Sequence, residues 1–229
     1  MNNITRFLDL YKGFESWAKD TYDVQTMQDL ERQEDYPGLS KYRSKLSFYR
    51  NLRNLLTHNN VMFGPNNEAV LKITNILIDD FKNLYNELKL PIISLALDVF
   101  SICKRTKADN VFEAMRIMNI NDYSHIPIME EGRVIGVFSE NTLFKMSCCS
   151  QIVSPDTTFA DLVPYIKVKE SNDSVYLFVP ADMTVPDALS LFQNANNEKR
   201  RLDILFITGD GTSQGVLKGM ITAWDMVAV

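Results

Sequence analysis

The first part of the chain carries apolar side chains at the spacing of amphipathic helices. Over residues 7–18, large apolar residues recur every three or four positions, which predicts a first helix. The same spacing predicts a second helix over about 40–58 and a third over about 68–90. The segment 59–67, with its Asn, Gly and Pro residues, has the composition of a loop. We therefore expect residues 1–90 to form a small antiparallel bundle of α-helices.

The remainder, residues 91–229, alternates short β-branched runs with helical stretches. Asp109–Met115 matches Met183–Leu189, each at the entry to a helix. Residues 125–143 match residues 204–226, each with a strand, a Gly turn, a second strand and a Ser or Thr that opens a helix. The pattern predicts a β-α-β-β-α unit written twice. The fold class of the whole chain is therefore expected to be α+β.

Composition limits the kinds of function that fit. The chain has 229 residues and a formal net charge of −5, which argues against broad, non-specific binding of nucleic acid. Its three cysteines, Cys103, Cys148 and Cys149, lack metal-ligand spacing and make a poor disulfide framework. The longest apolar run, residues 91–100, is too short to cross a bilayer. We expect a cytoplasmic protein with reduced thiols, no metal and no membrane segment.

The second copy of the repeated unit ends in a motif with candidate ligand groups. It reads Gly219-Met220-Ile221-Thr222-Ala223-Trp224-Asp225, which is Gly-apolar-apolar-Thr-x-x-Asp. With the duplication, this motif resembles a tandem pair of CBS (cystathionine β-synthase) domains, with units at 91–151 and 152–229. The resemblance implies clefts that bind an adenosine-type nucleotide, such as AMP or ATP, as a regulatory ligand. Asp225 would accept hydrogen bonds from the ribose hydroxyls, and Thr222 would contact ribose or phosphate.

The same motif has a purely structural interpretation. Thr222 and Asp225 stand at the spacing of a capping box, in which both side chains satisfy the start of a helix. The N–H groups of that helix start also suit a phosphate. The first copy has Thr142 in place of the Asp, so its cleft is expected to be empty or to bind a ligand only weakly. His125, at the start of the first unit's strand, is expected to be structural, with a ligand contact as the alternative.

A basic segment stands out within this acidic chain. Residues 36–67 contain no Asp or Glu, and the cations within them are Lys41, Arg43, Lys45, Arg50 and Arg53. On a helix, Phe48, Tyr49, Leu52, Leu55 and Leu56 fall on one side, and the basic residues fall on the other. Cations near a helix C-terminus complement the macrodipole, which accounts for Arg53 and His58 but not for Arg43.

The run Arg53-Asn54-Leu55-Leu56-Thr57-His58 closes this helix, before a loop and a final helix. It resembles the signature of the HEPN family (higher eukaryotes and prokaryotes nucleotide-binding), whose catalytic members are metal-independent endoribonucleases that act as homodimers. The resemblance implies that His58 is a general base or acid and that Arg53 stabilises the phosphorane-like state. Asn54 would orient the imidazole or the phosphate, and Arg43 and Arg50 would hold flanking phosphates of an RNA.

Together these patterns favour a CBS pair that binds an adenosine-type nucleotide and regulates an attached HEPN-like domain. No long linker separates the two, because the helix predicted to end at Leu90 runs directly into Pro91. One alternative is a non-catalytic nucleotide-sensing protein in which residues 1–90 serve for dimerisation. Another is a CBS pair that binds nothing and is purely architectural.

Overall fold

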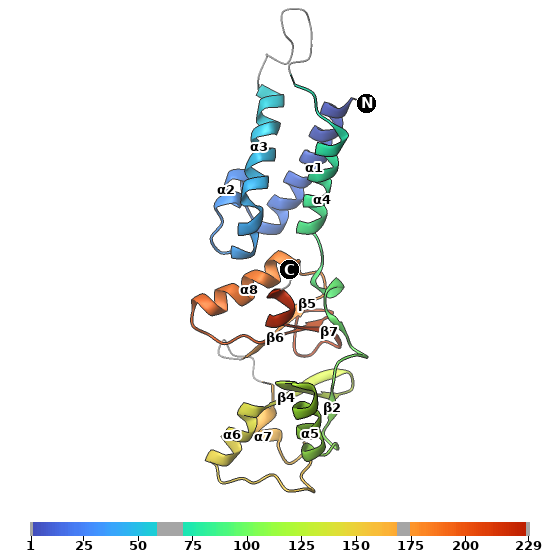
Figure 1. Ribbon diagram of the computed structural model, residues 1–229, viewed down its shortest axis with the longest axis vertical. Helices are drawn as coiled ribbons and strands as arrows, with labels where there is room; N and C mark the ends of the chain where they lie inside the picture. The colour runs from blue at the N-terminus through green and yellow to red at the C-terminus, as the bar shows by residue number, and fades with distance from the viewer. Residues whose placement is uncertain (1, 59–70, 169–174, 228–229) are drawn as a thin grey trace, which may run out of the picture. The chain divides into compact units, whose positions relative to one another are not determined.

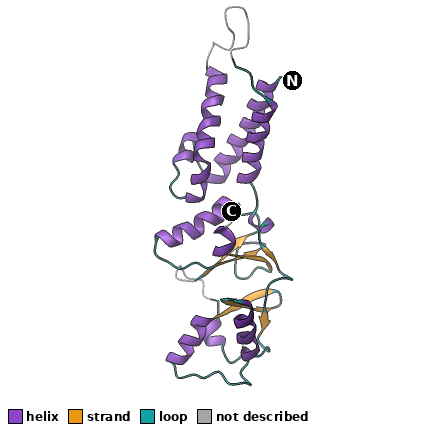
Figure 2. Cartoon of the chain, in the orientation of Figure 1, coloured by secondary structure: helices purple, strands orange, loops and turns teal. Residues whose placement is uncertain are grey.

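The computed structural model describes residues 2–58, 71–168 and 175–227 (Figure 1). The chain divides into two compact units. Unit 1 comprises Met1–Pro91 and Thr184–Asn197, and unit 2 comprises Ile92–Met183 and Glu198–Val229. The described part of unit 1 is helical, and the described strands belong to unit 2 (Figure 2).

Unit 1 contains five α-helices and one 3₁₀ helix in its described part. They are α1 (Asn3–Tyr22), α2 (Met27–Arg32), η1 (Pro37–Tyr42), α3 (Arg43–His58), α4 (Asn75–Leu88) and α8 (Val185–Asn197). The helices predicted over 7–18 and 40–58 are confirmed as α1 and α3. The N-terminal part is therefore a helical region, while its arrangement as an antiparallel bundle stays a prediction.

Two helix boundaries differ from the sequence-based expectation because of their caps. The helix expected from about residue 68 is described from Asn75, where the Thr74 side chain accepts a hydrogen bond from the Leu77 N–H. Residues 68–70 lie outside the described part. The short helix α2 was missed, because its polar sequence hides a capping box between Thr26 and Asp29.

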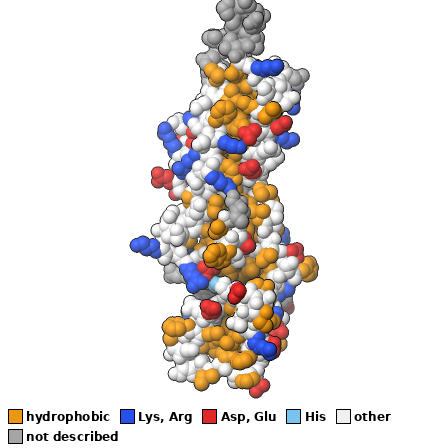
Figure 3. All heavy atoms as spheres, viewed as in Figure 1, with side chains coloured by type: hydrophobic (Ala, Val, Ile, Leu, Met, Phe, Trp, Pro, Cys, Tyr) orange, Lys and Arg blue, Asp and Glu red, His pale blue; other side chains and the backbone are white. Residues whose placement is uncertain are grey.

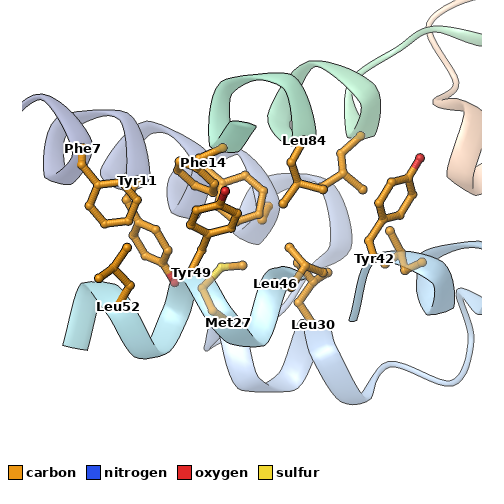
Figure 4. Close-up of a cluster of buried hydrophobic side chains, with 14 of the residues drawn as sticks. Phe7, Tyr11, Phe14, Met27, Leu30, Tyr42, Leu46, Tyr49, Leu52 and Leu84 are labelled. Atoms are coloured by element: carbon orange, nitrogen blue, oxygen red, sulfur yellow. The ribbon is translucent and has the colours of Figure 1, made fainter. Parts of the chain in front are cut away.

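Aromatic side chains form the core of the N-terminal helices. Phe81 of α4 lies 4.5 Å from Tyr49 and 5.4 Å from Phe14, measured between ring centroids. Phe7 and Tyr11 of α1 lie in the same cluster, which Figure 4 shows between the helices. Burying a side chain such as Phe81 contributes about 1.5–3 kcal/mol, so these contacts hold the helical region together.

The buried face of α3 is narrower than its sequence suggested. Its side chains Leu46, Tyr49, Leu52 and Leu56 are buried at helical spacing. Phe48 and Leu55 were expected on the same side, but they are 54% and 43% exposed. Each stands about 100° around the helix from a buried neighbour, so neither reaches the core. The expected five-residue apolar face was therefore wrong at these two positions.

Helix α8 packs against η1 through an unusually close backbone contact. The Gly38 N–H donates to the Ser190 hydroxyl at 3.0 Å, and the Asn194 amide donates to the Asp35 carbonyl at 3.0 Å. A Cβ at Gly38 would overlap the backbone oxygen of Pro186. Only glycine therefore allows this approach of the two helices.

Unit 2 contains two sheets and the remaining helices. The strands are β1 (Leu97–Asp98), β2 (Arg105–Thr106), β3 (His125–Glu130), β4 (Arg133–Ser139), β5 (Tyr176–Pro180), β6 (Ile204–Thr208) and β7 (Leu217–Thr222). The helices are η2 (Ile92–Ser94), α5 (Val111–Asn121), α6 (Glu140–Cys148), α7 (Val163–Ile166) and α9 (Ala223–Val227). One sheet has the order β1-β7-β6-β5 and the other β2-β3-β4.

The two sheets repeat one connectivity. In each, a first strand is parallel to a second, which continues through an antiparallel hairpin into a third. A helix follows the first strand and another follows the third, giving β2-α5-β3-β4-α6 and β5-α8-β6-β7-α9. The duplicated β-α-β-β-α unit predicted from the sequence is therefore confirmed.

Candidate functional site

The Gly219–Asp225 motif occupies the end of β7 and the start of α9. At Gly219, a Cβ would come within 3.0 Å of the Ala96 Cβ and 3.1 Å of the Leu97 carbonyl oxygen. Strand β1 pairs with β7 at this point, with Asp98 opposite Gly219. The close passage of β1 would therefore crowd any side chain at this position of the motif.

Asp225 and Thr222 form one half of a capping box, in which the acid accepts hydrogen bonds from the residue before the helix. The Thr222 N–H and hydroxyl each donate to Asp225 Oδ2 at 2.7 Å. Thr158 makes the same two bonds to Asp161, both at 2.9 Å. Because the pattern recurs elsewhere in the chain, Thr-x-x-Asp alone is a local structural device.

A pocket distinguishes Asp225 from Asp161. Its volume is about 370 Å³, and Asp225 lines it whereas Asp161 does not. The other lining residues fall within 97–103, 122–125, 201–204 and 220–224, all in unit 2. Both repeated units therefore contribute to its wall. The volume falls within the roughly 300–1,000 Å³ typical of small-molecule sites.

His125 lies in the wall of this pocket as part of a polar cluster. Its Nδ1 is 2.8 Å from the Ser124 hydroxyl, and its Nε2 is 3.5 Å from Asp203 Oδ2. Arg201 Nε lies 2.7 Å from the same Asp203 oxygen. Burial lowers the pKa of His125, although the Asp203 carboxylate opposes this effect. The imidazole is thus neutral at pH 7 and held by its neighbours.

Sequence reasoning missed most of the pocket wall. It considered His125 mainly as a structural residue and assigned no role to Tyr123, Arg201, Asp203 or Trp224, which line the pocket. Trp224 stands inside the quoted motif, and its side chain is 84% exposed. Arg201 and Asp203 directly precede β6, the counterpart of β3. Aligning the strand entries of the two copies would have identified them as candidates.

The first copy lacks the corresponding acidic group. Thr142, at the position of Asp225, is buried, and its hydroxyl accepts a hydrogen bond from the Ser139 N–H at 3.1 Å. The Thr142 hydroxyl is thus used in capping α6, and the residue is only 4% exposed. Thr142 therefore offers a ligand little accessible surface.

In the helical region, Arg53 and Asn54 lie together near the end of α3. The Arg53 guanidinium donates to Asn54 Oδ1 at 3.1 Å. Both residues line a hollow of about 220 Å³, together with Tyr11 and Glu15. His58 is the last residue of α3, but its side chain lies outside the described part of the chain.

The other cations of α3 meet partners from distant sequence. Arg50 Nε lies 2.7 Å from Glu31 Oε1, and Lys45 Nζ lies 3.0 Å from Asp80 Oδ1. The Arg43 guanidinium donates to the Gln33 carbonyl at 3.1 Å. The segment 36–67 contains no acidic residue, but the folded chain brings acceptors from other segments to its cations. Figure 3 shows Lys and Arg side chains interspersed with Asp and Glu on one face. Contacts of Arg43 and Arg50 with RNA stay predictions.

Comparison with known families identifies the C-terminal part of the chain. Residues 106–148 and 168–229 match the family model of the CBS domain. These segments cover the two repeated units, so the chain contains a tandem pair of CBS domains, as the sequence predicted. The match lies outside the N-terminal helices, and the HEPN-like character of residues 1–90 stays a prediction.

Solved CBS structures are similar at low sequence identity. The CBS domain of a putative transporter from Clostridium difficile 630 is 12% identical, with a TM-score of 0.42 over 61% of this chain and 92% of that chain. CBSX2 in complex with AMP is 15% identical, with a TM-score of 0.44 over 61% of this chain and 94% of that chain. CbpB in complex with c-di-AMP is 14% identical, with a TM-score of 0.48 over 66% of this chain and 90% of that chain.

A search of curated proteins found no match. Among the described residues, no helix has the length and apolarity needed to cross a membrane.

Proposed function

We propose that the protein is a regulatory nucleotide sensor whose ligand pocket is the one lined by Thr222, Trp224 and Asp225. The pocket takes an adenosine-type ligand, the class that the CBS resemblance implies. Occupancy then changes the state of the N-terminal helical region. The CBS units of this assignment are residues 91–151 and 152–229.

The observation that supports the proposal most directly is the position of the Asp225 carboxylate. Oδ2 is committed to Thr222, while within the described part of the chain Oδ1 accepts no hydrogen bond. A carboxylate oxygen beside a pocket is a strong acceptor for the paired hydroxyls of a ribose. The internal bonds to Thr222 hold the carboxylate in place, so binding costs little side-chain entropy.

Aromatic side chains at the pocket suit a purine. Trp224 and Tyr123 line it and are 84% and 42% exposed, so each has a ring face available for stacking. Stacking of a base on an aromatic ring contributes roughly 1–3 kcal/mol. We place the ribose at Asp225 and the base against one of these rings.

Calorimetric titration of the full chain with adenosine and AMP tests this function. Binding at one site per chain is expected, because Thr142 replaces the acid in the first copy. Asp225→Ala should weaken binding at least tenfold, about 1.4 kcal/mol. Asp161→Ala is the matched control, since it removes the same capping bonds outside the pocket. Equal losses in both variants, or no loss in either, would contradict the assignment.

A second candidate function concerns the helical region. We propose that Arg53, Asn54 and His58 serve a HEPN-type, metal-independent endoribonuclease that acts as a homodimer, with Arg43 and Arg50 near flanking phosphates. The supporting observation is that Arg53 forms no ion pair within the described residues, unlike Lys45 and Arg50. Its guanidinium therefore remains available to a phosphate. The rival is a non-catalytic nucleotide sensor whose helical region serves for dimerisation.

Incubation with single-stranded and structured RNA, with and without adenosine or AMP, separates these possibilities. A ribonuclease of this type leaves 2′,3′-cyclic phosphate and 5′-hydroxyl ends, and Arg53→Ala and His58→Ala should each abolish cleavage. Lys45→Ala serves as the control, because it removes only an exposed ion pair. Cleavage that persists in His58→Ala, or no cleavage by any form, favours the non-catalytic rival.

A further inference from the structure

The pocket at Asp225 contains more carboxylates than cations. Asp122, Asp203 and Asp225 line it, and Arg201 is the one guanidinium among its described lining residues. The formal charge of the wall is therefore an excess of two negative charges, since burial keeps His125 uncharged at pH 7. A wall of this sign repels an anionic ligand.

Some of the hydrogen-bond donors that a phosphate would use at this helix start are already paired within the protein. The Thr222 N–H and hydroxyl donate to Asp225, and the Ala223 N–H donates to the Asp203 carbonyl at 3.0 Å. The N–H groups of Thr222 and Ala223 are therefore not available to a phosphate, while the Asp225 carboxylate suits a hydroxyl donor.

Arg201 offsets this charge only in part. Its Nε lies 2.7 Å from Asp203 Oδ2, and its side chain is 67% exposed. The guanidinium therefore compensates one carboxylate, and solvent screens what is left. Its terminal nitrogens can still reach one anionic group, so a single phosphate is tolerated better than several.

We infer that the pocket selects adenosine derivatives of low negative charge and rejects nucleoside di- and triphosphates, with Asp122 and Asp203 as the specificity-determining residues. The inference rests on the proposed function and states which members of the adenosine class the site takes. Its physical basis is like-charge repulsion, which grows with each phosphate placed near the two carboxylates.

A series of ligands that differ only at the 5′ position tests the inference. We expect 5′-amino-5′-deoxyadenosine, a cation, to bind at least as tightly as adenosine, followed by AMP and then ATP. ATP should bind at least tenfold more weakly than adenosine at about 0.15 M salt, where the Debye length is about 8 Å. Titrations are done without divalent cations and followed by calorimetry.

One carboxylate can be neutralised with little structural cost. Asp122 caps α5 in the left-handed conformation (φ 55°), which asparagine also adopts readily. Asp122→Asn should raise the affinity for ATP relative to the affinity for adenosine at least threefold. Asp161→Asn, outside the pocket, should change neither affinity.

Two results overturn the inference while leaving the proposed function intact. One is ATP binding as tightly as adenosine in the unmodified protein, and the other is an unchanged ATP-to-adenosine ratio in Asp122→Asn. The absence of binding by every member of the series would overturn the proposed function itself.

Discussion

At the scale of single residues, Asp225 has both a structural and a candidate ligand-binding role. One carboxylate oxygen accepts both hydrogen bonds from Thr222 at the start of α9, and Asp225 also lines a pocket. Asp161 makes the same bonds without the pocket, so sequence alone cannot separate the two cases. The difference lies in what the rest of unit 2 places around each acid.

His125 makes a residue-scale prediction about pH. Burial lowers its pKa in the folded protein, while the unfolded chain titrates near 6.5. Below this value the unfolded state binds more protons, so the stability contributed by the neutral imidazole is complete above pH 6.5 and is lost as the pH falls. Urea unfolding at pH 7.5 and 5.5 should therefore show a smaller pH dependence in His125→Gln.

The groups that face His125 are Asp203, Arg201 and Glu140, and they remain in this variant. His58 also remains, so it contributes equally to both proteins. An identical loss of stability between the two pH values in His125→Gln would show that the buried imidazole is not the cause.

At the scale of elements, the contact between η1 and α8 gives a sharp pair of substitutions. Gly38→Ala should destabilise the protein by at least about 1–3 kcal/mol, since the new methyl group meets the backbone of Pro186, which cannot move aside cheaply. Gly13→Ala should stabilise it by about 0.5–1 kcal/mol, because Gly13 is inside α1 with nothing within 4 Å of its Cβ position. Denaturant unfolding measures both.

Neither glycine has a positive φ, so the space around each Cβ position should decide the sign, and the opposite signs are the test. Equal free energies of unfolding for Gly38→Ala and Gly13→Ala would show that η1 and α8 do not approach each other as closely as described.

Periodicity predicted the existence of elements better than their faces and ends. The helices α1 and α3 and the duplicated strand–helix unit follow from apolar spacing, since that spacing reflects burial directly. The capping box that starts α2 was hidden in polar sequence. Local spacing also could not reveal that Glu31 and Asp80 would meet cations of α3, because those contacts join residues distant in sequence.

At the scale of the whole molecule, α8 links the two units along the chain. Sequence duplication assigns it to the second CBS unit, between β5 and β6, yet its contacts place it in unit 1 with η1. The sequence duplication could not predict the contact between α8 and η1, because it shows which elements correspond in the two copies and not what each element packs against. The helix ends at Asn197, and the pocket residues begin at Arg201.

This connection predicts that ligand binding is felt in the helical region. A ligand that orders residues 201–204 removes local freedom just after α8, and a more ordered α8 should stabilise its contact with η1. Hydrogen exchange should therefore slow in 185–197 and in 37–42 when adenosine binds, as well as in the pocket itself. Asp225→Ala should abolish all of these changes.

Ser190→Ala tests the route. It removes the hydrogen bond from the Gly38 N–H to the Ser190 hydroxyl without touching a pocket residue. Protection of 37–42 on binding should shrink in this variant, while protection of 201–204 persists. Coupling is reciprocal: if binding stabilises the contact between η1 and α8, that contact also favours binding. Losing it in Ser190→Ala should therefore weaken adenosine binding by the same free energy as the loss of ligand-induced stabilisation of the contact. If adenosine slowed hydrogen exchange only at the pocket of the unmodified protein, α8 would not couple ligand binding to the helical region. That region would then be regulated by other means or not at all.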